Sequence, residues 1–298
     1  MTALEFIKLK QKAWAERKKC KDFELRPGTI ANEDGDKIYF EKIDDNIYEK
    51  LSPNNKKFFK KGQGNETDDN CIRRAKMKSA VSSSAIAVNL FQHWQEKEDI
   101  SPLLKALRII RKNNRTTTNA TIKFEDKKEI INPETSETIS TPNLDITIES
   151  KNLQHIIAIE SKFTEPYSSK TQKELSEKYN NENLWVGLEN IKNEIYKLEN
   201  EKKEKIFKFK RLDYLQLIKH ILGLKSKHGK KFKLLYLWYD VPGTEGYEHR
   251  QEIEYFKKLV KDKVDFCHIT YQEVIFNLKE NYYDEHKDYI DYLVERYL

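Results

Sequence analysis

PNLDITIE at residues 142–149 and HIIAIESK at residues 155–162 are the two neighbouring segments that decide the fold of this chain. The first alternates apolar with polar residues, which is the period-two pattern of a half-buried strand. The second is an apolar run that ends in Glu160 and Lys162, whose side chains share one face of a strand because they are two residues apart. A polar turn over residues 151–154 would join the strands into a hairpin. Antiparallel pairing then brings Asp145 near Glu160.

This arrangement indicates a particular chemistry. Two adjacent carboxylates repel each other, and a divalent cation removes that cost. Hard oxygen ligands at a partly open site suit Mg²⁺, and the backbone carbonyl of Ser161 could add a third oxygen to those of Asp145 and Glu160. Lys162 could hold or deprotonate a water, while the metal lowers the pKa of that water and stabilises charge on a phosphate. The pattern therefore favours metal-assisted phosphodiester hydrolysis.

The competing interpretation is a solvated strand end. Charged residues make up 35% of the chain, so a Glu-x-Lys tripeptide arises easily by chance. The nearest competitor is Glu149-Ser150-Lys151, but it runs into the expected turn. Only Glu160-Ser161-Lys162 ends a continuous apolar strand that follows a second strand carrying an aspartate.

At Asp145 and at Glu160-Ser161-Lys162 the chain resembles the PD-(D/E)XK nuclease superfamily, which has the restriction-endonuclease-like fold. Pro142 lies three residues before Asp145 and not beside it, in a part of the pattern that is loose in the superfamily. Residues 62–66, 76–79 and 82–91 also resemble a bacterial branch of these proteins. The resemblance implies an α/β fold with a mixed central sheet flanked by helices, and Mg²⁺ as cofactor, for which Mn²⁺ can substitute.

The resemblance also suggests further site residues. In this fold an acidic residue from the N-terminal helical region often joins the metal site, and Glu66 is the candidate, with a solvated loop glutamate as the alternative. A helix after the motif strand often presents a polar side chain to substrate, and Gln216 is a candidate for that role. His220 fits a surface or core histidine better than a metal ligand. Glu165 and Tyr167 follow the motif strand and could lie near the scissile bond, although packing explains Tyr167 equally well.

Composition limits the class of protein. The 298 residues suffice for one large α/β domain or one domain with additions, and a net charge of +6 permits a nucleic-acid partner without requiring it. Three scattered cysteines, Cys20, Cys71 and Cys267, show no zinc spacing and fit a reducing compartment. We expect a cytoplasmic protein, because no apolar run is long enough to span a membrane and the first residues lack a signal-peptide pattern.

The order of elements predicts an N-terminal helical region over residues 1–60 and a nuclease domain over residues 61–298, with a charged helical insertion at about 171–210. Residues 43–60 and 76–97 are expected to be helical. Strands alternate with helices in the second half, which predicts parallel neighbours joined by right-handed crossovers. Basic stretches at 56–61, 108–115 and 225–233 could hold a phosphate backbone, or they could be solvated faces.

The leading hypothesis is a Mg²⁺-dependent endonuclease acting on DNA, of restriction or defence type. Asp145, Glu160, the Ser161 carbonyl and Glu66 would hold the metal, and Lys162 would position or activate the attacking water. Cutting both strands would favour a homodimer. The alternative is a catalytically inactive protein of the same fold that binds nucleic acid or a protein partner.

Overall fold

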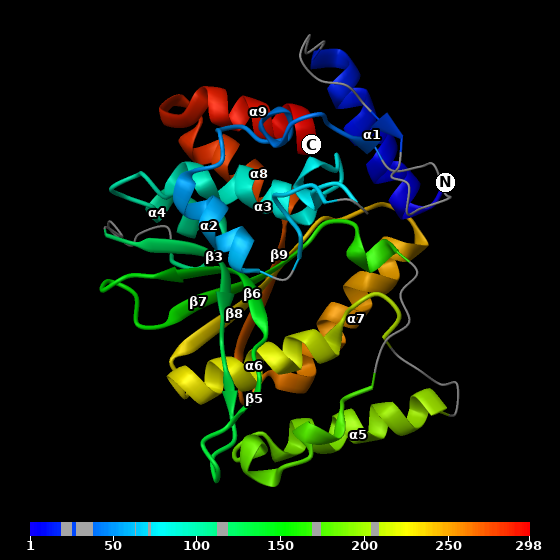
Figure 1. Cartoon of the computed structure of the whole chain (residues 1–298), viewed down its shortest axis with the longest axis vertical. Coiled ribbons are helices and arrows are strands. Elements are labelled where there is room, and N and C mark those ends of the chain that lie inside the picture. Colours follow the sequence, from blue (N-terminus) through cyan, green and yellow to red (C-terminus); the bar gives the residue numbers. More distant parts are fainter. Residues whose placement is uncertain are drawn as a thin grey trace.

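The structure is a computed structural model that describes residues 1–18, 26–27, 38–62, 64–70, 73–111, 119–168, 174–203 and 209–298 (Figure 1). Its helices are α1 Ala3–Lys18, α2 Pro53–Lys61, α3 Ser83–Phe91, α4 Ser101–Ala106, α5 Glu189–Lys203, α6 Tyr214–His228, α7 Thr244–Val260, α8 Tyr271–Tyr282 and α9 Lys287–Tyr297. Short 3₁₀ turns are η1 Ile43–Asn46, η2 Lys76–Lys78, η3 Gln92–Trp94, η4 Glu165–Tyr167, η5 Glu177–Tyr179, η6 Glu182–Trp185 and η7 Asp284–His286.

A five-stranded mixed sheet forms the centre, in the order β3-β6-β7-β8-β9. Its strands are β3 Thr121–Lys127, β6 Asn143–Glu149, β7 Ile156–Lys162, β8 Phe232–Trp238 and β9 Asp265–Thr270. The pairs β3–β6 and β6–β7 are antiparallel, whereas β7–β8 and β8–β9 are parallel. Two small ribbons complete the strands, β1 Arg26–Pro27 with β2 Ile38–Tyr39 and β4 Ile130–Ile131 with β5 Thr138–Ser140. The expected mixed α/β sheet is confirmed.

Each face of the sheet carries its own hydrophobic core. Helices α2, α3, α4, α8 and α9 lie on one face, and α5, α6 and α7 lie on the other (Figure 1). β7 shows why: Ile157 and Ile159 join the first core, whereas Ile156 and Ala158 join the second. An apolar run therefore fits a central strand, since alternate side chains are buried on opposite faces.

Two expected helices begin later than predicted. Pro53 does not interrupt a helix over residues 43–60 but opens α2, and the Ser52 side chain caps it by accepting from Asn55 N at 3.2 Å. The helix expected over residues 76–97 begins at Ser83, because the Ser82 hydroxyl accepts from Ala85 N at 3.2 Å and serves as its N-cap. Serine therefore sets the start of both helices.

The charged insertion is partly buried. α5 places Ile191, Ile195 and Leu198 in the second core, so its apolar stripe packs while its charged face remains outside. Residues 169–173 and 204–208 of this segment lie outside the described residues. The boundary at residue 60 stays a prediction.

The C-terminal helix α9 contacts the N-terminal elements through Arg296. Arg296 of α9 is 1% exposed and donates to Gln11 Oε1 at 2.9 Å and to the Asn46 carbonyl at 2.7 Å. Its guanidinium also lies over the Trp14 ring, 4.3 Å from the centroid. Within the described residues this buried cation has no carboxylate partner, so neutral acceptors and an aromatic ring alone satisfy it.

Cys267 is a free cysteine, and Cys20 and Cys71 lie outside the described residues. Among the helices of the described chain, none combines the length and the apolar character needed to cross a membrane. The basic stretch at residues 56–61 forms part of α2, where Phe59 packs on Phe124 with ring centroids 5.4 Å apart. Of the stretch at residues 108–115, only residues 108–111 are described.

Candidate active site

The motif strands lie in the middle of the sheet. β6 and β7 pair Ile146 with Ile159 and Thr147 with Ala158, and continuing that register places Asp145 opposite Glu160. The predicted hairpin is thus confirmed.

Glu160 is a fully buried carboxylate that lies between Lys162 and His220. Its side chain is 0% exposed, Lys162 Nζ donates to Oε1, and His220 Nε2 lies 2.7 Å from Oε2. Burial pushes the pKa of Glu160 upward, but Lys162 and His220 outweigh burial and lower it to about 2. Glu160 therefore remains ionised inside the protein.

The pKa of Asp145 is shifted in the opposite direction from that of Glu160. The Oδ2 atom of Asp145 accepts from the backbone N–H of Ser161 at 2.7 Å, which fixes it beside the motif tripeptide. Burial and then the charge of Glu160 raise the pKa of Asp145 well above its usual value, although Lys162 opposes them. The structure therefore brings Asp145, Glu160 and Lys162 together, as the sequence predicts.

Lys162 is fixed from two sides. Its Nζ donates to Glu160 and to Gln216 Oε1, the latter at 3.0 Å. Burial lowers the pKa of Lys162, but Glu160 and Asp145 outweigh burial and raise it above its usual value. Lys162 is consequently an ammonium group that donates hydrogen bonds, and Gln216 of α6 orients it.

His220 departs from the satisfied core histidine that the sequence suggests. It is 1% exposed on α6, one turn after Gln216, and its Nε2 lies against Glu160. Both ring nitrogens lack a hydrogen bond of good geometry, because the 2.7 Å contact with Glu160 is poorly aligned. His220 belongs to the carboxylate cluster, and its one-turn spacing from Gln216 was the signal in the sequence.

Glu66 points inward and is not a solvated loop residue. It is 8% exposed, accepts from Ser84 Oγ at 2.6 Å and pairs with Lys76 Nζ at 3.3 Å. A Cβ on Gly64 would stand 2.3 Å from Glu66 Oε1, so glycine at this position gives the carboxylate its room. The serine-rich segment before and within α3 thus serves the same cluster through Ser84.

Glu125 is a candidate that sequence reasoning missed. It lies on β3 with a φ of 53°, an unusual left-handed conformation for a glutamate, and Asn143 Nδ2 donates to its Oε2. Burial, then Glu66, then Glu160 raise the pKa of Glu125 to about 7. Glu125 is therefore within electrostatic reach of both carboxylates. The adjacent pair of acids at 125–126 in an alternating strand was the available signal.

Residues around the motif strand brace it. The hydroxyl of Ser161 and the hydroxyl of Tyr271 at the start of α8 share a hydrogen bond of 2.6 Å on the opposite face of the sheet. Burial raises the pKa of Glu165 while the charge of Lys162 lowers it, so Glu165 lies near the motif lysine. The Oε2 atom of Glu165 accepts from Phe163 N at 2.9 Å and Thr164 N at 3.1 Å. Both contacts shape the turn that leaves β7.

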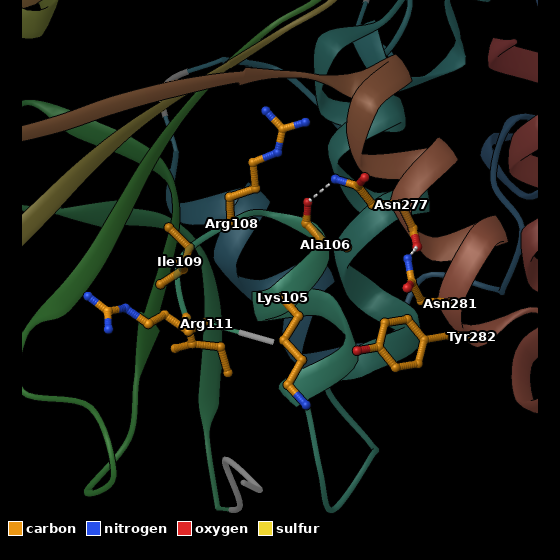
Figure 2. Close-up of a pocket in the computed structure, with 9 residues that line it drawn as sticks. Lys105, Ala106, Arg108, Ile109, Arg111, Asn277, Asn281 and Tyr282 are labelled. Atoms are coloured by element: carbon orange, nitrogen blue, oxygen red, sulfur yellow. Dashed lines mark hydrogen bonds between the residues drawn. The ribbon is translucent and has the colours of Figure 1, made fainter. Parts of the chain in front are cut away.

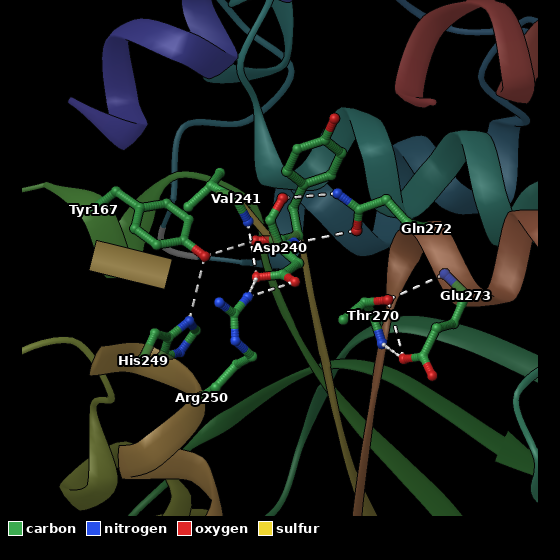
Figure 3. Close-up of polar contacts among 9 residues, drawn as sticks. Tyr167, Asp240, Val241, His249, Arg250, Thr270, Gln272 and Glu273 are labelled. Carbon is green, nitrogen blue, oxygen red and sulfur yellow. Dashed lines mark hydrogen bonds and ion pairs between the residues drawn. The ribbon is translucent and has the colours of Figure 1, made fainter. Parts of the chain in front are cut away.

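Tyr167 is a packing residue. It is 4% exposed, and its hydroxyl donates to the Tyr239 carbonyl at 2.8 Å and lies 3.4 Å from His249 Nδ1 (Figure 3). Beside it, Arg250 Nη1 contacts both carboxylate oxygens of Asp240. Of the two interpretations of Tyr167, the structure supports packing.

The cluster fits a hard divalent cation in its chemistry. Asp145, Glu160, Glu66 and Glu125 supply carboxylate oxygens, and Glu160 Oε2, which lies 2.7 Å from His220 Nε2, accepts no hydrogen bond of good geometry. Neighbouring negative charge contributes to the raised pKa values of Asp145 and Glu125, so the cluster is short of positive charge. Across the described residues, however, no three His, Cys, Asp or Glu side chains already stand together as metal ligands.

Comparison with known proteins places the chain in a family. A family model described as Restriction Endonuclease associating with ARP matches residues 9–298, which is nearly the whole chain. No curated protein and no solved structure matches. This family is of restriction-endonuclease type, which agrees with the mixed sheet and the motif strands. The family indicates a nuclease-type function. The chain belongs to the family described as Restriction Endonuclease associating with ARP.

Proposed function

We propose that this chain is a Mg²⁺-dependent endonuclease of restriction or defence type that hydrolyses phosphodiester bonds in DNA. One observation carries the proposal: Asp145, Glu160 and Lys162 form a charged cluster, with Glu160 fully buried and the other two partly buried, on adjacent strands of a chain in a restriction endonuclease family. Buried charges are costly, and proteins retain them where they serve function or specificity.

Asp145, Glu160 and the Ser161 carbonyl would hold the metal, and Glu66 or Glu125 would complete the shell. The metal would acidify a bound water and stabilise charge on the phosphate, and Mn²⁺ would substitute for Mg²⁺. In hydrolysis a water oxygen bonds to phosphorus, one P–O ester bond breaks, and the leaving oxygen takes up a proton.

Lys162 would act as a fixed hydrogen-bond donor. Its ammonium group is oriented by Gln216 at 3.0 Å and can donate to the attacking water or to a phosphate oxygen. His220 holds Glu160 from the side of α6, which leaves Glu160 fewer orientations. We therefore expect substitution of Gln216 or His220 to reduce cleavage less than substitution of Lys162 does.

DNA would be bound through its backbone. The densest basic stretch, residues 225–233, runs from the end of α6 into the start of β8, whose first residue Phe232 pairs with Ile156 at the start of β7. The stretch therefore lies at the other end of the strand from Glu160 and Lys162. Phosphate contacts there would engage DNA away from the scissile bond, and affinity should fall steeply with salt.

The test is cleavage of supercoiled plasmid by purified protein with Mg²⁺ or Mn²⁺ and with EDTA as control. Lys162→Ala should abolish metal-dependent cleavage. The matched control is Lys151→Ala, which alters the other Glu-Ser-Lys tripeptide of this hairpin at an exposed position. Circular dichroism must show both variants folded. Undiminished cleavage by Lys162→Ala would refute the assignment.

A partner-binding protein without catalysis is the second candidate. Lys162 already pairs with Glu160 in the absence of a metal, as it would in an inactive member of the fold. The family description also names an association with ARP, which supports a protein partner for either candidate. DNA binding without cleavage in any divalent metal would favour this candidate.

For the active enzyme, we propose that a homodimer cuts both strands. Mass photometry of the protein on DNA would detect the dimer.

A further inference from the structure

A hollow of about 800 Å³ lies between the end of α4 and the C-terminal half of α8 (Figure 2). This volume is within the range of pockets that take small molecules. Its polar lining comes from two short segments: Lys105, Arg108 and Arg111 from the α4 side, and Asn277, Asn281 and Tyr282 from α8. None of the residues assigned to the carboxylate cluster lines it, so it is a separate site.

The α4 side of the hollow is positively charged. Arg108 Nη1 pairs with Glu273 Oε1 at 3.0 Å, and both side chains are partly exposed. Lys105 and Arg111 form no ion pair with any residue that the structure describes. Two cations that line a hollow and have no ion-pair partner among the described residues are available for an anionic ligand.

The backbone at the end of α4 has an unusual conformation at Arg108, a third basic residue that lines the hollow. Arg108 has a φ of 58°, a left-handed conformation in which helices usually place glycine. Arg108 N donates to the Lys105 carbonyl at 3.0 Å and Ile109 N to the Leu104 carbonyl at 2.9 Å, which is the paired ending of a Schellman motif. An arginine at this position costs backbone energy that glycine would avoid, and such strain is often found at functional sites.

The α8 side offers neutral polar groups and a ring. Asn277 Nδ2 donates to the Ala106 carbonyl at 2.9 Å, and Asn281 Nδ2 donates to the Asn277 carbonyl at 2.8 Å. Their amide nitrogens are thus oriented by the protein. Figure 2 shows the Tyr282 ring on α8 with its hydroxyl turned towards α4. Cations, amides and an aromatic ring around one hollow match the phosphate, base edge and base face of a nucleotide.

We propose that this α4–α8 pocket binds a phosphate-bearing nucleotide unit. Lys105 and Arg111 contact the phosphate, Tyr282 stacks on the base, and Asn281 contacts the base edge. The phosphate comes either from a free nucleotide or from a strand of DNA, since both present the same chemistry.

The test measures binding with EDTA present, so that it does not depend on the proposed nuclease activity. The probes are inorganic phosphate, ATP and a fluorescent twelve-nucleotide single strand, titrated at low salt. The pocket variant is Lys105→Ala with Arg111→Ala. The matched control, Lys258→Ala with Lys261→Ala, removes the same charge from exposed positions at the end of α7.

The pocket variant should bind ATP or the single strand about 100-fold more weakly, about tenfold for each cation lost, whereas the control should stay near the original affinity. Binding of the strand but not of ATP, lost in the pocket variant, assigns the phosphate to DNA. Equal binding by both double variants, or binding of no probe, would overturn the proposal.

Discussion

His249 should make the protein sensitive to acid in a way that one substitution removes. It is fully buried on α7, with Nε2 3.0 Å from the Tyr236 hydroxyl and Nδ1 3.4 Å from the Tyr167 hydroxyl. Because the Tyr167 hydroxyl donates to the Tyr239 carbonyl, it can only accept from Nδ1–H. That leaves Nε2 to accept from Tyr236, so the ring is satisfied in its neutral form.

Burial, with Arg211 and Arg250 adding to it, lowers the pKa of His249 from 6.5 to about 3. Between those values the unfolded chain binds a proton at this residue and the folded chain does not. Stability therefore rises with pH across this window and falls as the pH drops through it. The loss is about 2 kcal/mol between pH 7 and pH 5, and it reaches about 4 kcal/mol at pH 3. For a domain stable by about 5–15 kcal/mol, that is a large fraction.

The assay is urea unfolding at pH 7 and pH 5 for the original protein and for His249→Gln. The variant will be less stable at both values, but it should lose about 2 kcal/mol less between them, because glutamine does not titrate. His155→Gln, at a partly exposed histidine, is the control and should follow the original. If the pH dependence of His249→Gln matches that of the original within about 0.5 kcal/mol, His249 is not the buried neutral group described.

Three further predictions concern packing and the cluster. Arg296→Met should lower the free energy of unfolding by about 3 kcal/mol or more in urea titration, because it leaves buried acceptors at Gln11 and Asn46 unpaired. Gly246→Ala should destabilise α7 by about 2 kcal/mol or more in the same assay, opposite in sign to an ordinary helical Gly→Ala, because its Cβ would stand 1.9 Å from the Val241 carbonyl oxygen. Mg²⁺ binding at pH 6.5 should release protons, because Glu125, with a pKa of about 7, is largely protonated before the cation binds. Calorimetry in buffers of different ionisation enthalpy measures this release. If no protons are released, the metal binds elsewhere.

The motif strands could be predicted because their information is local. The period-two alternation in residues 142–149 and the apolar run in 155–162 each specify a strand and its faces, and a short turn fixes their register. Asp145, Glu160 and Lys162 follow from that register alone. Gln216 could be proposed only because the resembled fold supplies a helix at that point.

Glu125 and His220 could not be predicted in the same way. Glu125 lies opposite Asp145 because β3 pairs with β6, with Phe124 opposite Ile146 and Asp126 opposite Leu144, and the local pattern does not say which strand pairs with residues 142–149. His220 reaches Glu160 because α6 packs across β7, a contact between residues 60 positions apart in sequence. Local patterns identify strands and faces, whereas the positions of these two side chains depend on how distant elements pack.

The electrostatics of the cluster explain why its carboxylates and cations occur together. Glu66, Glu125, Asp145 and Glu160 are four carboxylates, and only the ammonium groups of Lys162 and Lys76 contact them as lysine partners. Burial and the neighbouring carboxylates raise the pKa values of Asp145 and Glu125. Protonation of these two side chains therefore reduces the repulsion within the cluster when no further cation is bound. Replacing a buried charged cluster with apolar side chains is often neutral or stabilising, so stability alone does not account for these carboxylates. A divalent cation bound there, as we propose, would reduce the repulsion between them.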